Sequence, residues 1–284
     1  MMEWLPEPFD LALYQRALLA CLMIGFANGY ASAFVLLNRS PLKLSALSHS
    51  ILPGVAVAVW VSGLTLMSAF VGATLCAVLI GLLSIAFSQH SRITQDTALT
   101  VLYTGAFSMG VVILGRIGES QELEHWLFGN VLGMADADLW MSFAAGFLAV
   151  LLLTLFRRPV LLNLFEADVA RTLGVRTQAL NYGLFILMVL TLVTTLQAVG
   201  CILAVGLIVT PAATVRQFTQ SATVLFLGSG VLGAVGSAGG LVLSYSLNLP
   251  AGASIVLVLS GLFVLSFPLR LFRSSVASRS NQEK

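Results

Sequence analysis

One histidine stands out because it lies at the start of a long apolar stretch. His49 occurs in the segment 45–54 (SALSHSILPG), and Ser45 precedes it by four residues, so both share one face if the segment is helical. Ionisable side chains inside membrane spans are costly and therefore candidates for function. A neutral imidazole can bind a passing transition metal ion. The alternative left open by the residue alone is a histidine that hydrogen-bonds to a neighbouring helix.

Acidic residues mark two further places. Asp96 opens an apolar stretch in the segment 94–98 (TQDTA), where an acid suits a helix N-terminus, so a capping role is favoured. The segment 119–125 (ESQELEH) is acidic and ends in His125. It could concentrate cations or dock a partner, or it could be an ordinary solvated loop.

A polar segment in the second half of the chain has the pattern of a short helix. Acids come first in 164–176 (LFEADVARTLGVR), a small apolar stripe follows, and a glycine stops the run. Such a helix can lie on the membrane surface or dock on a soluble partner, and the pattern does not decide between the two. The residues concerned are Phe165, Glu166, Ala167, Asp168, Ala170, Arg171 and Gly174.

Common enzyme motifs are absent from the sequence. Neither lysine, Lys43 nor Lys284, follows the glycine pattern of a phosphate-binding loop, so we expect no ATP hydrolysis by this chain. No HExxH surrounds a histidine, and no GxSxG occurs. The 3 cysteines are far apart in apolar runs, which disfavours a zinc site or a disulfide framework. We therefore expect no catalytic residue and no bound cofactor.

The composition indicates an integral membrane protein. Hydrophobic residues make up 58% of the 284 residues and charged residues 9%, against about 25% charged residues in soluble domains. A net charge of +2 gives no reason to expect a nucleic-acid partner. We predict an all-α fold of nine transmembrane helices, with eight plus a re-entrant segment as the alternative. The predicted spans are 11–37, 45–62, 64–87, 97–115, 138–156, 178–196, 199–215, 222–243 and 252–270.

Two of these spans contain helix-breaking residues. Pro53 and Gly54 should interrupt the second span, and Pro211 the seventh. Small residues crowd the eighth span, which favours close packing between helices over the alternative of a subunit interface. They include Gly228, Ser229, Gly230, Gly233, Ala234, Gly236, Gly239 and Gly240.

The distribution of basic residues predicts the orientation. With the N-terminus outside and the C-terminus in the cytoplasm, all of the 14 Lys and Arg residues except Arg16 and Arg116 fall on the cytoplasmic side. Most acidic residues fall outside. We expect a single transmembrane domain over 1–273, with a cytoplasmic loop at 157–177 and a polar cytoplasmic tail at 274–284.

Six stretches, in their order along the chain, resemble the permease subunits of zinc, manganese and iron ABC importers, the ABC-3 permease family. Together they cover most of the chain between residues 25 and 266, so the likeness is specific although no single motif is decisive. They are 47–54 (LSHSILPG), 96–110 (DTALTVLYTGAFSMG), 127–133 (LFGNVLG), 165–175 (FEADVARTLGV), 198–214 (AVGCILAVGLIVTPAAT) and 241–254 (LVLSYSLNLPAGAS).

The resemblance implies a function and a set of partners. It implies a homodimeric permease in a bacterial inner membrane, with two ATP-binding subunits on the cytoplasmic side and a metal-binding solute-binding protein outside. ATP would act on the partner subunit. The transported metal would be zinc or manganese, and iron or a metal chelate is less favoured. The loop 165–175 is similar to the family's coupling helix, which favours docking on the ATPase.

The resemblance also implies a role for His49, with one departure. Family members commonly carry Asp-x-x-x-His at the start of this helix, on the metal path. Here the histidine is kept, but Ser45 stands at the position of the acid, and a neutral hydroxyl is a weaker ligand for a divalent cation. The acid could come from elsewhere, the site could be weaker, or the substrate could differ.

A stand-alone secondary transporter or channel is the competing interpretation. It would require paired acids or a charged relay within the membrane. The sequence has none at the middle of a predicted span. An intramembrane enzyme is disfavoured by the absence of catalytic motifs.

Overall fold

The computed structural model describes residues 12–62, 66–117 and 136–282, and these residues form helices joined by short turns. The predicted loop 119–125 and the matching stretch 127–133 lie outside the described residues. The helices are α1 (Ala12–Leu37), α2 (Pro41–Ser62), α3 (Leu66–His90), α4 (Gln95–Ile117), α6 (Asp136–Leu155), α7 (Arg157–Phe165), α8 (Ala167–Thr172), α9 (Thr177–Val199), α10 (Cys201–Arg216), α11 (Ala222–Leu247) and α12 (Ala251–Gln282).

The chain is a multi-pass helical membrane protein, as predicted. Each predicted span coincides with a helix, and seven of the described helices are long and apolar enough to cross a bilayer. An eighth span is reached if α6 and α7 are one broken span, bent by 69°. The described helix at Leu203–Arg216 is apolar but shorter. The count of nine and the orientation remain predictions.

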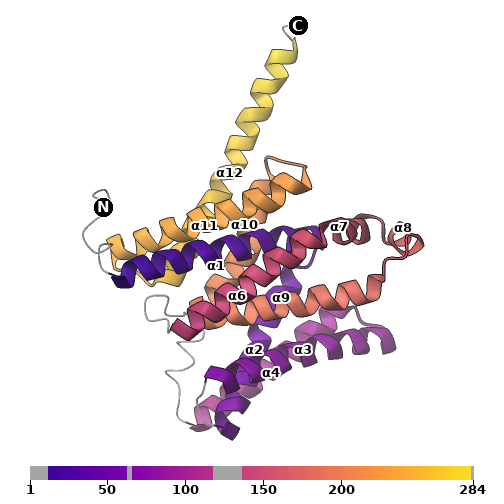
Figure 1. The fold of residues 1–284 in the computed structure, drawn as a ribbon, viewed down its shortest axis with the longest axis vertical. Helices are drawn as coiled ribbons and strands as arrows, with labels where there is room; N and C mark the ends of the chain where they lie inside the picture. The colour runs from indigo at the N-terminus through magenta and orange to yellow at the C-terminus, as the bar shows by residue number, and fades with distance from the viewer. Residues whose placement is uncertain (1–11, 63–65, 118–135, 283–284) are drawn as a thin grey trace.

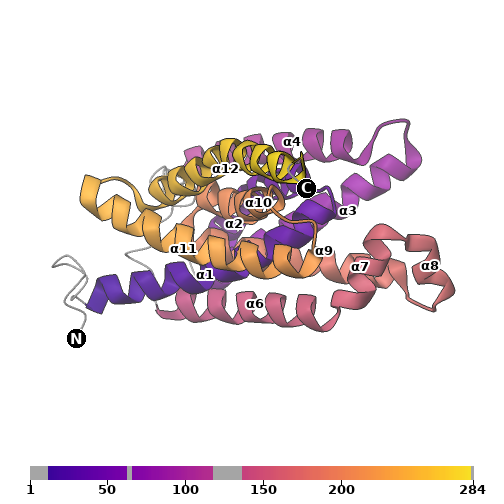
Figure 2. The ribbon, with the colours of Figure 1, turned by 90° about the horizontal axis from the view of Figure 1, so that it is seen from above.

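The helices form two packed groups (Figures 1 and 2). α2, α3 and α4 pack on one another, and α1, α10, α11 and α12 form the second group. α9 contacts α3 in the first group and α10 in the second, while α6 packs on α1 and α9. The largest apolar cluster draws side chains from both groups, including Phe34, Ile51, Leu192, Ile208 and Phe226.

The small residues of α11 pack within the chain. A Cβ atom at Gly233 would lie 2.2 Å from the carbonyl oxygen of Gly25 on α1, so only glycine permits this approach. Ser229 of α11 is fully buried. Small residues at such a contact let two helix backbones come close, which favours association inside a bilayer. At Gly233 the packing interpretation of the sequence therefore holds.

The expected interruptions at proline are not found. Pro53 lies inside the continuous helix α2, and Pro211 lies inside α10. Next to Pro211, the amide of Ala212 donates a hydrogen bond to the Ser32 hydroxyl on α1 at 3.1 Å. A neighbouring helix thus supplies a partner for the backbone beside the proline, which is how membrane helices tolerate proline without ending.

Candidate functional site

The candidate ligand His49 lies where α2 packs against α4. Its imidazole is near-parallel to the Tyr103 ring, with centroids 6.0 Å apart and planes 26° apart. The Phe107 ring meets it edge-on at 5.8 Å and 84°. Tyr103 and Phe107 are one helical turn apart on α4, so both reach the same spot on α2. Aromatic contacts at these distances are favourable and restrict the orientation of the imidazole.

Close backbone packing holds α4 at this distance from α2. A Cβ atom at Gly110 would lie 2.8 Å from the Pro53 Cα atom, inside any normal contact. Leu52 and Ala56 of α2 continue the contact and form a small buried cluster with Leu114 of α4. The LPG sequence of α2 and the glycine of α4 therefore fix the two helices that position His49.

The second predicted residue, Ser45, lies one turn before His49 in the same helix. Both side chains are half-buried. The hydroxyl of Ser48 donates a hydrogen bond to the Ser45 carbonyl at 2.7 Å, within the same turn. An imidazole nitrogen and a serine hydroxyl on one face can bind a transition metal ion only weakly, because neither carries a charge. Among the described residues, no three His, Cys, Asp or Glu side chains cluster as a metal-binding group.

The aromatic neighbours of His49 were not identified from the sequence. Tyr103 and Phe107 fall within the stretch 96–110, which was matched to the family without assigning a role to either ring. Their four-residue spacing was the available signal, because it places two rings on one helix face. What the sequence could not supply is which helix this face meets.

The segment 165–175 forms the predicted short helix. α8 spans Ala167–Thr172 and is followed by Gly174, whose φ of +81° is a left-handed conformation that suits glycine. The Gly174 amide bonds to the Arg171 carbonyl and the Val175 amide to the Ala170 carbonyl, both at 3.0 Å. These two bonds are those of a Schellman C-cap. The predicted glycine stop is therefore present.

The surface of this segment divides into a buried and an exposed side. Ala170 is fully buried, whereas Phe165 and Leu173 are 67% and 68% exposed. Glu166 and Asp168 are also exposed, and Asp168 lies 3.3 Å from Arg171. Exposed apolar side chains among charged ones on a surface segment are features suited to a protein partner. Figures 1 and 2 show α8 lying beyond the end of α9, at one extreme of the molecule.

Comparison with known proteins identifies relatives along nearly the whole chain. The family model described as "ABC 3 transport family" matches residues 10–270. The manganese transport system membrane protein MntC of Halalkalibacterium halodurans is 36% identical over 254 residues, which are 89% of this chain and 86% of that protein. The chelated iron transport system membrane protein YfeD of Yersinia pestis is 32% identical, over 92% of this chain and 86% of that protein.

Solved structures give the same relationship. PsaBC from Streptococcus pneumoniae, in complex with Fab, matches with a TM-score of 0.82 and 32% identity over 91% of this chain and 92% of that chain. An inward-facing metal-chelate type ABC transporter matches with a TM-score of 0.72 at 16% identity, which supports the fold alone. The family model and the relatives cover most of the sequence, and this chain therefore belongs to the ABC 3 transport family.

Proposed function

We propose that this chain is the membrane permease subunit of an ATP-binding-cassette importer that carries a divalent transition metal ion into the cytoplasm. The observation that carries the proposal is the position of His49 in a chain of this family. This candidate nitrogen ligand on α2 packs against the Tyr103 and Phe107 rings of α4. His49 and Ser45 would line the path of the ion. As cargo, the metal needs ligands that bind it briefly and release it.

The relatives favour manganese or iron as the cargo. The names of these relatives specify manganese and chelated iron, whereas zinc rests on the family resemblance alone. Ser45 bears on this choice because it stands where a carboxylate is common in the family. A site with imidazole and hydroxyl ligands would hold a hard divalent ion less strongly than one with a carboxylate. A chelated metal, which brings its own ligands, is the second candidate cargo.

The proposed assembly is a permease homodimer with two ATP-binding subunits and an extracytoplasmic solute-binding protein. ATP would be bound and hydrolysed by the partner subunits, and this chain would bind no cofactor. One short segment, which includes α8, would dock on the ATPase. Its residues are Phe165, Glu166, Ala167, Asp168, Ala170, Arg171, Leu173 and Gly174. ATP-driven closure of the ATPases would move α8 and thereby bias the permease between outward and inward access.

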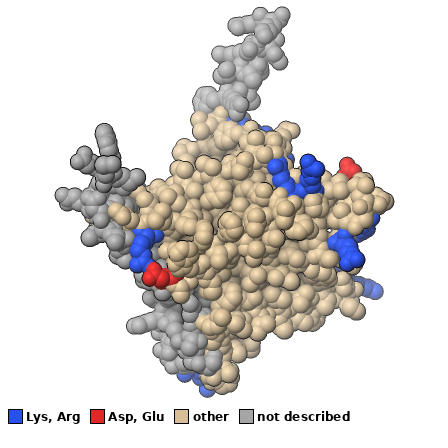
Figure 3. All heavy atoms as spheres, in the orientation of Figure 1, with Lys and Arg blue, Asp and Glu red and all other residues tan. Residues whose placement is uncertain are grey.

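The proposed location is the bacterial inner membrane, with α7 and α8 on the cytoplasmic side. On the face drawn in Figure 3, Lys and Arg side chains gather mainly over the end that carries α7 and α8. A basic excess on one side of the membrane is typical of cytoplasmic loops. α1 and α6 begin at the opposite end in Figure 1, where Arg16 and Asp136 contact each other.

Metal accumulation in starved cells tests the proposal. Cells that carry this chain together with its ATPase and binding protein would be supplied separately with manganese, iron and zinc. The control is the same cells with the nucleotide site of the ATPase disabled. We expect uptake of one metal that disappears in the control. Uptake that persists in the control would contradict the proposal and indicate a secondary transporter or channel. If no free ion is accumulated, chelated metals are the next substrates to supply.

A further inference from the structure

A charged contact joins α2 and α4 at their first turns. The Lys43 ammonium lies 3.5 Å from a carboxylate oxygen of Asp96 and donates to the side-chain oxygen of Gln95 at 3.3 Å. The Lys43 side chain is 36% exposed and that of Asp96 is 64% exposed. Ion pairs between groups this exposed contribute little to stability. The Lys43–Asp96 ion pair can therefore break and form again without unfolding the surrounding helices.

This ion pair lies on the same interface as His49. Asp96 precedes Tyr103 and Phe107 by seven and eleven residues, so the three side chains follow one face of α4. On α2, Lys43 precedes His49 by six residues, roughly 9 Å along the helix axis. A cation that leaves His49 along α4 toward the start of α2 therefore meets Asp96, the one acidic side chain in the described part of α4.

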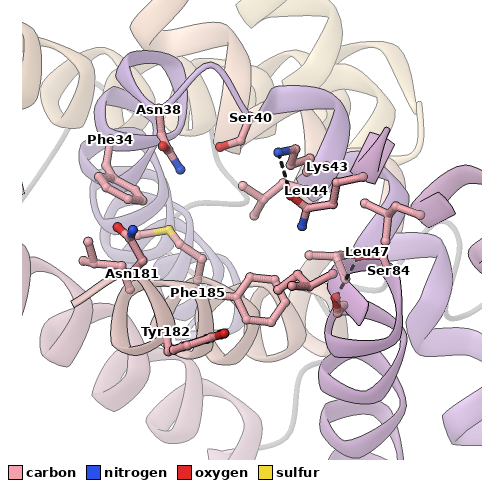
Figure 4. Close-up of a pocket in the computed structure, with 16 residues that line it drawn as sticks. Phe34, Asn38, Ser40, Lys43, Leu44, Leu47, Ser84, Asn181, Tyr182 and Phe185 are labelled. Atoms are coloured by element: carbon pink, nitrogen blue, oxygen red, sulfur yellow. Dashed lines mark hydrogen bonds between the residues drawn. The ribbon is translucent and has the colours of Figure 1, made fainter. Parts of the chain in front are cut away.

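A cavity lies beside Lys43. Its volume is about 270 Å³, and both Lys43 and Gln95 are in its wall. Asn38, Ser40 and Asn181 bring polar atoms to the same cavity, which the apolar side chains of Phe185 and Leu47 also line (Figure 4). The cavity gives a displaced ammonium both room and oxygen acceptors. Lys43 can thus leave Asp96 without being driven into an apolar environment.

We propose that Asp96 binds the cation after His49 does. Until the cation arrives, the Lys43 ammonium is paired with the Asp96 carboxylate. The inference rests on the proposed import function and adds a second step to the same path. A divalent cation attracts a carboxylate more strongly than an ammonium does and repels that ammonium. The exchange frees Lys43 to turn toward the cavity. Asp96 thus supplies a carboxylate at a second position of the path, separate from His49 and Ser45.

The test compares the two members of the pair in the complete transporter. The permease, its ATPase and its binding protein are reconstituted in lipid vesicles, and ATP-driven manganese uptake and thermal stability are measured for the wild type, Asp96→Asn, Asp96→Glu and Lys43→Met. The matched control is the exposed contact at the other end of the molecule, with Arg16→Met and Asp136→Asn. These control variants remove the same charges from the first turns of α1 and α6 and leave α2 and α4 unchanged.

We expect an asymmetry between the two partners. Asp96→Asn should reduce the maximal uptake rate by about tenfold, a barrier increase typical of losing one charged contact, whereas Asp96→Glu should retain most of the rate. Lys43→Met should stay within about twofold of the wild-type rate, because the carboxylate remains available. The control variants should match the wild type.

Two results would overturn the inference. Equal losses of uptake in Asp96→Asn and Lys43→Met, with equal falls in the unfolding temperature, would make the pair a structural contact only. Wild-type uptake in both variants would remove any role for the pair in transport. A wild-type transporter that shows no ATP-driven metal uptake would instead contradict the proposed function, so the two failures are distinguishable.

Discussion

The imidazole of His49 on α2 and the phenol ring of Tyr103 on α4 lie nearly parallel, with 6.0 Å between their centroids. The two residues come from helices that are separated in the sequence by the whole of α3. The stacked ring limits rotation of the imidazole, so its nitrogen atoms keep a defined direction at the α2–α4 interface. A ligand with a fixed orientation binds a passing ion without first losing rotational freedom.

Removal of the Tyr103 ring should impair transport without unfolding the protein. Tyr103→Leu leaves the imidazole free to rotate, and we expect the maximal uptake rate to fall by about tenfold, equivalent to about 1.4 kcal/mol. Tyr103→Phe keeps the stacked ring and should retain most of the rate. Transport assays on vesicles that contain the complete transporter would measure this difference. Equal rates for the two variants would show that the ring does not act through His49.

Restoration of an acid one turn before His49 should strengthen metal binding. Ser45→Asp places a carboxylate on the face of His49, and we expect the purified chain to bind manganese at least about tenfold more tightly, or about 1.4 kcal/mol. Ser45→Asn is the neutral control of similar size and should leave the affinity unchanged. Calorimetric titration of both variants provides the comparison. Identical affinities would place position 45 outside the site.

Two glycines of α4 should respond oppositely to substitution by alanine. Gly110→Ala forces a Cβ atom toward the Pro53 backbone, and overpacking of this kind costs about 1–3 kcal/mol. Gly105→Ala adds the same atom where nothing lies within 4 Å. Because alanine favours a helix more than glycine does, this variant should be as stable as the wild type or slightly more stable. Thermal unfolding of the purified chain measures both. A destabilised Gly105→Ala with an unaffected Gly110→Ala would contradict the described packing of α2 and α4.

The exposed leucine that follows α8 should be needed for assembly. Leu173→Asp puts a charge on the proposed docking surface, and loss of an interface hot spot costs about 2 kcal/mol or more. Less ATPase should therefore copurify with this variant. Leu42→Asp, which changes an even more exposed leucine at the start of α2, is the matched control and should copurify normally. Normal assembly of Leu173→Asp would exclude this segment as the docking site.

The membrane spans could be predicted from the sequence because long apolar runs leave few alternatives. Nine such runs were expected, and each one contains a helix. The short α8 and its glycine stop were also predictable, since acids, a small apolar stripe and Gly174 form a local pattern. Pro53 was misleading, because its effect depends on the neighbouring helix that packs against it and not on the residue alone.

The contacts between helices could not be predicted in the same way. His49 and Asp96 were each recognised, but their partners Tyr103 and Lys43 lie on different helices, and only the packing of α4 across α2 brings them together. Asp96 was interpreted as a helix cap because its own helix was the only context that the sequence offered. In the structure the Thr97 amide donates a hydrogen bond to the Thr94 hydroxyl at 3.3 Å. Asp96 instead forms an ion pair with Lys43. Local patterns thus identify candidates, whereas tertiary packing decides what each can contact.

Manganese uptake by a His49 variant is the decisive measurement for a metal path at the α2–α4 interface. Two variants, His49→Ala and His90→Ala, would be compared in vesicles with the complete transporter at equal protein levels. His90 is the matched control because it is exposed at the end of α3 and its ring nitrogen lies 2.9 Å from the Ala86 carbonyl oxygen in the same helix. We expect His49→Ala to abolish ATP-driven uptake and His90→Ala to transport at the wild-type rate. Undiminished uptake by His49→Ala would contradict a metal path through the α2–α4 interface.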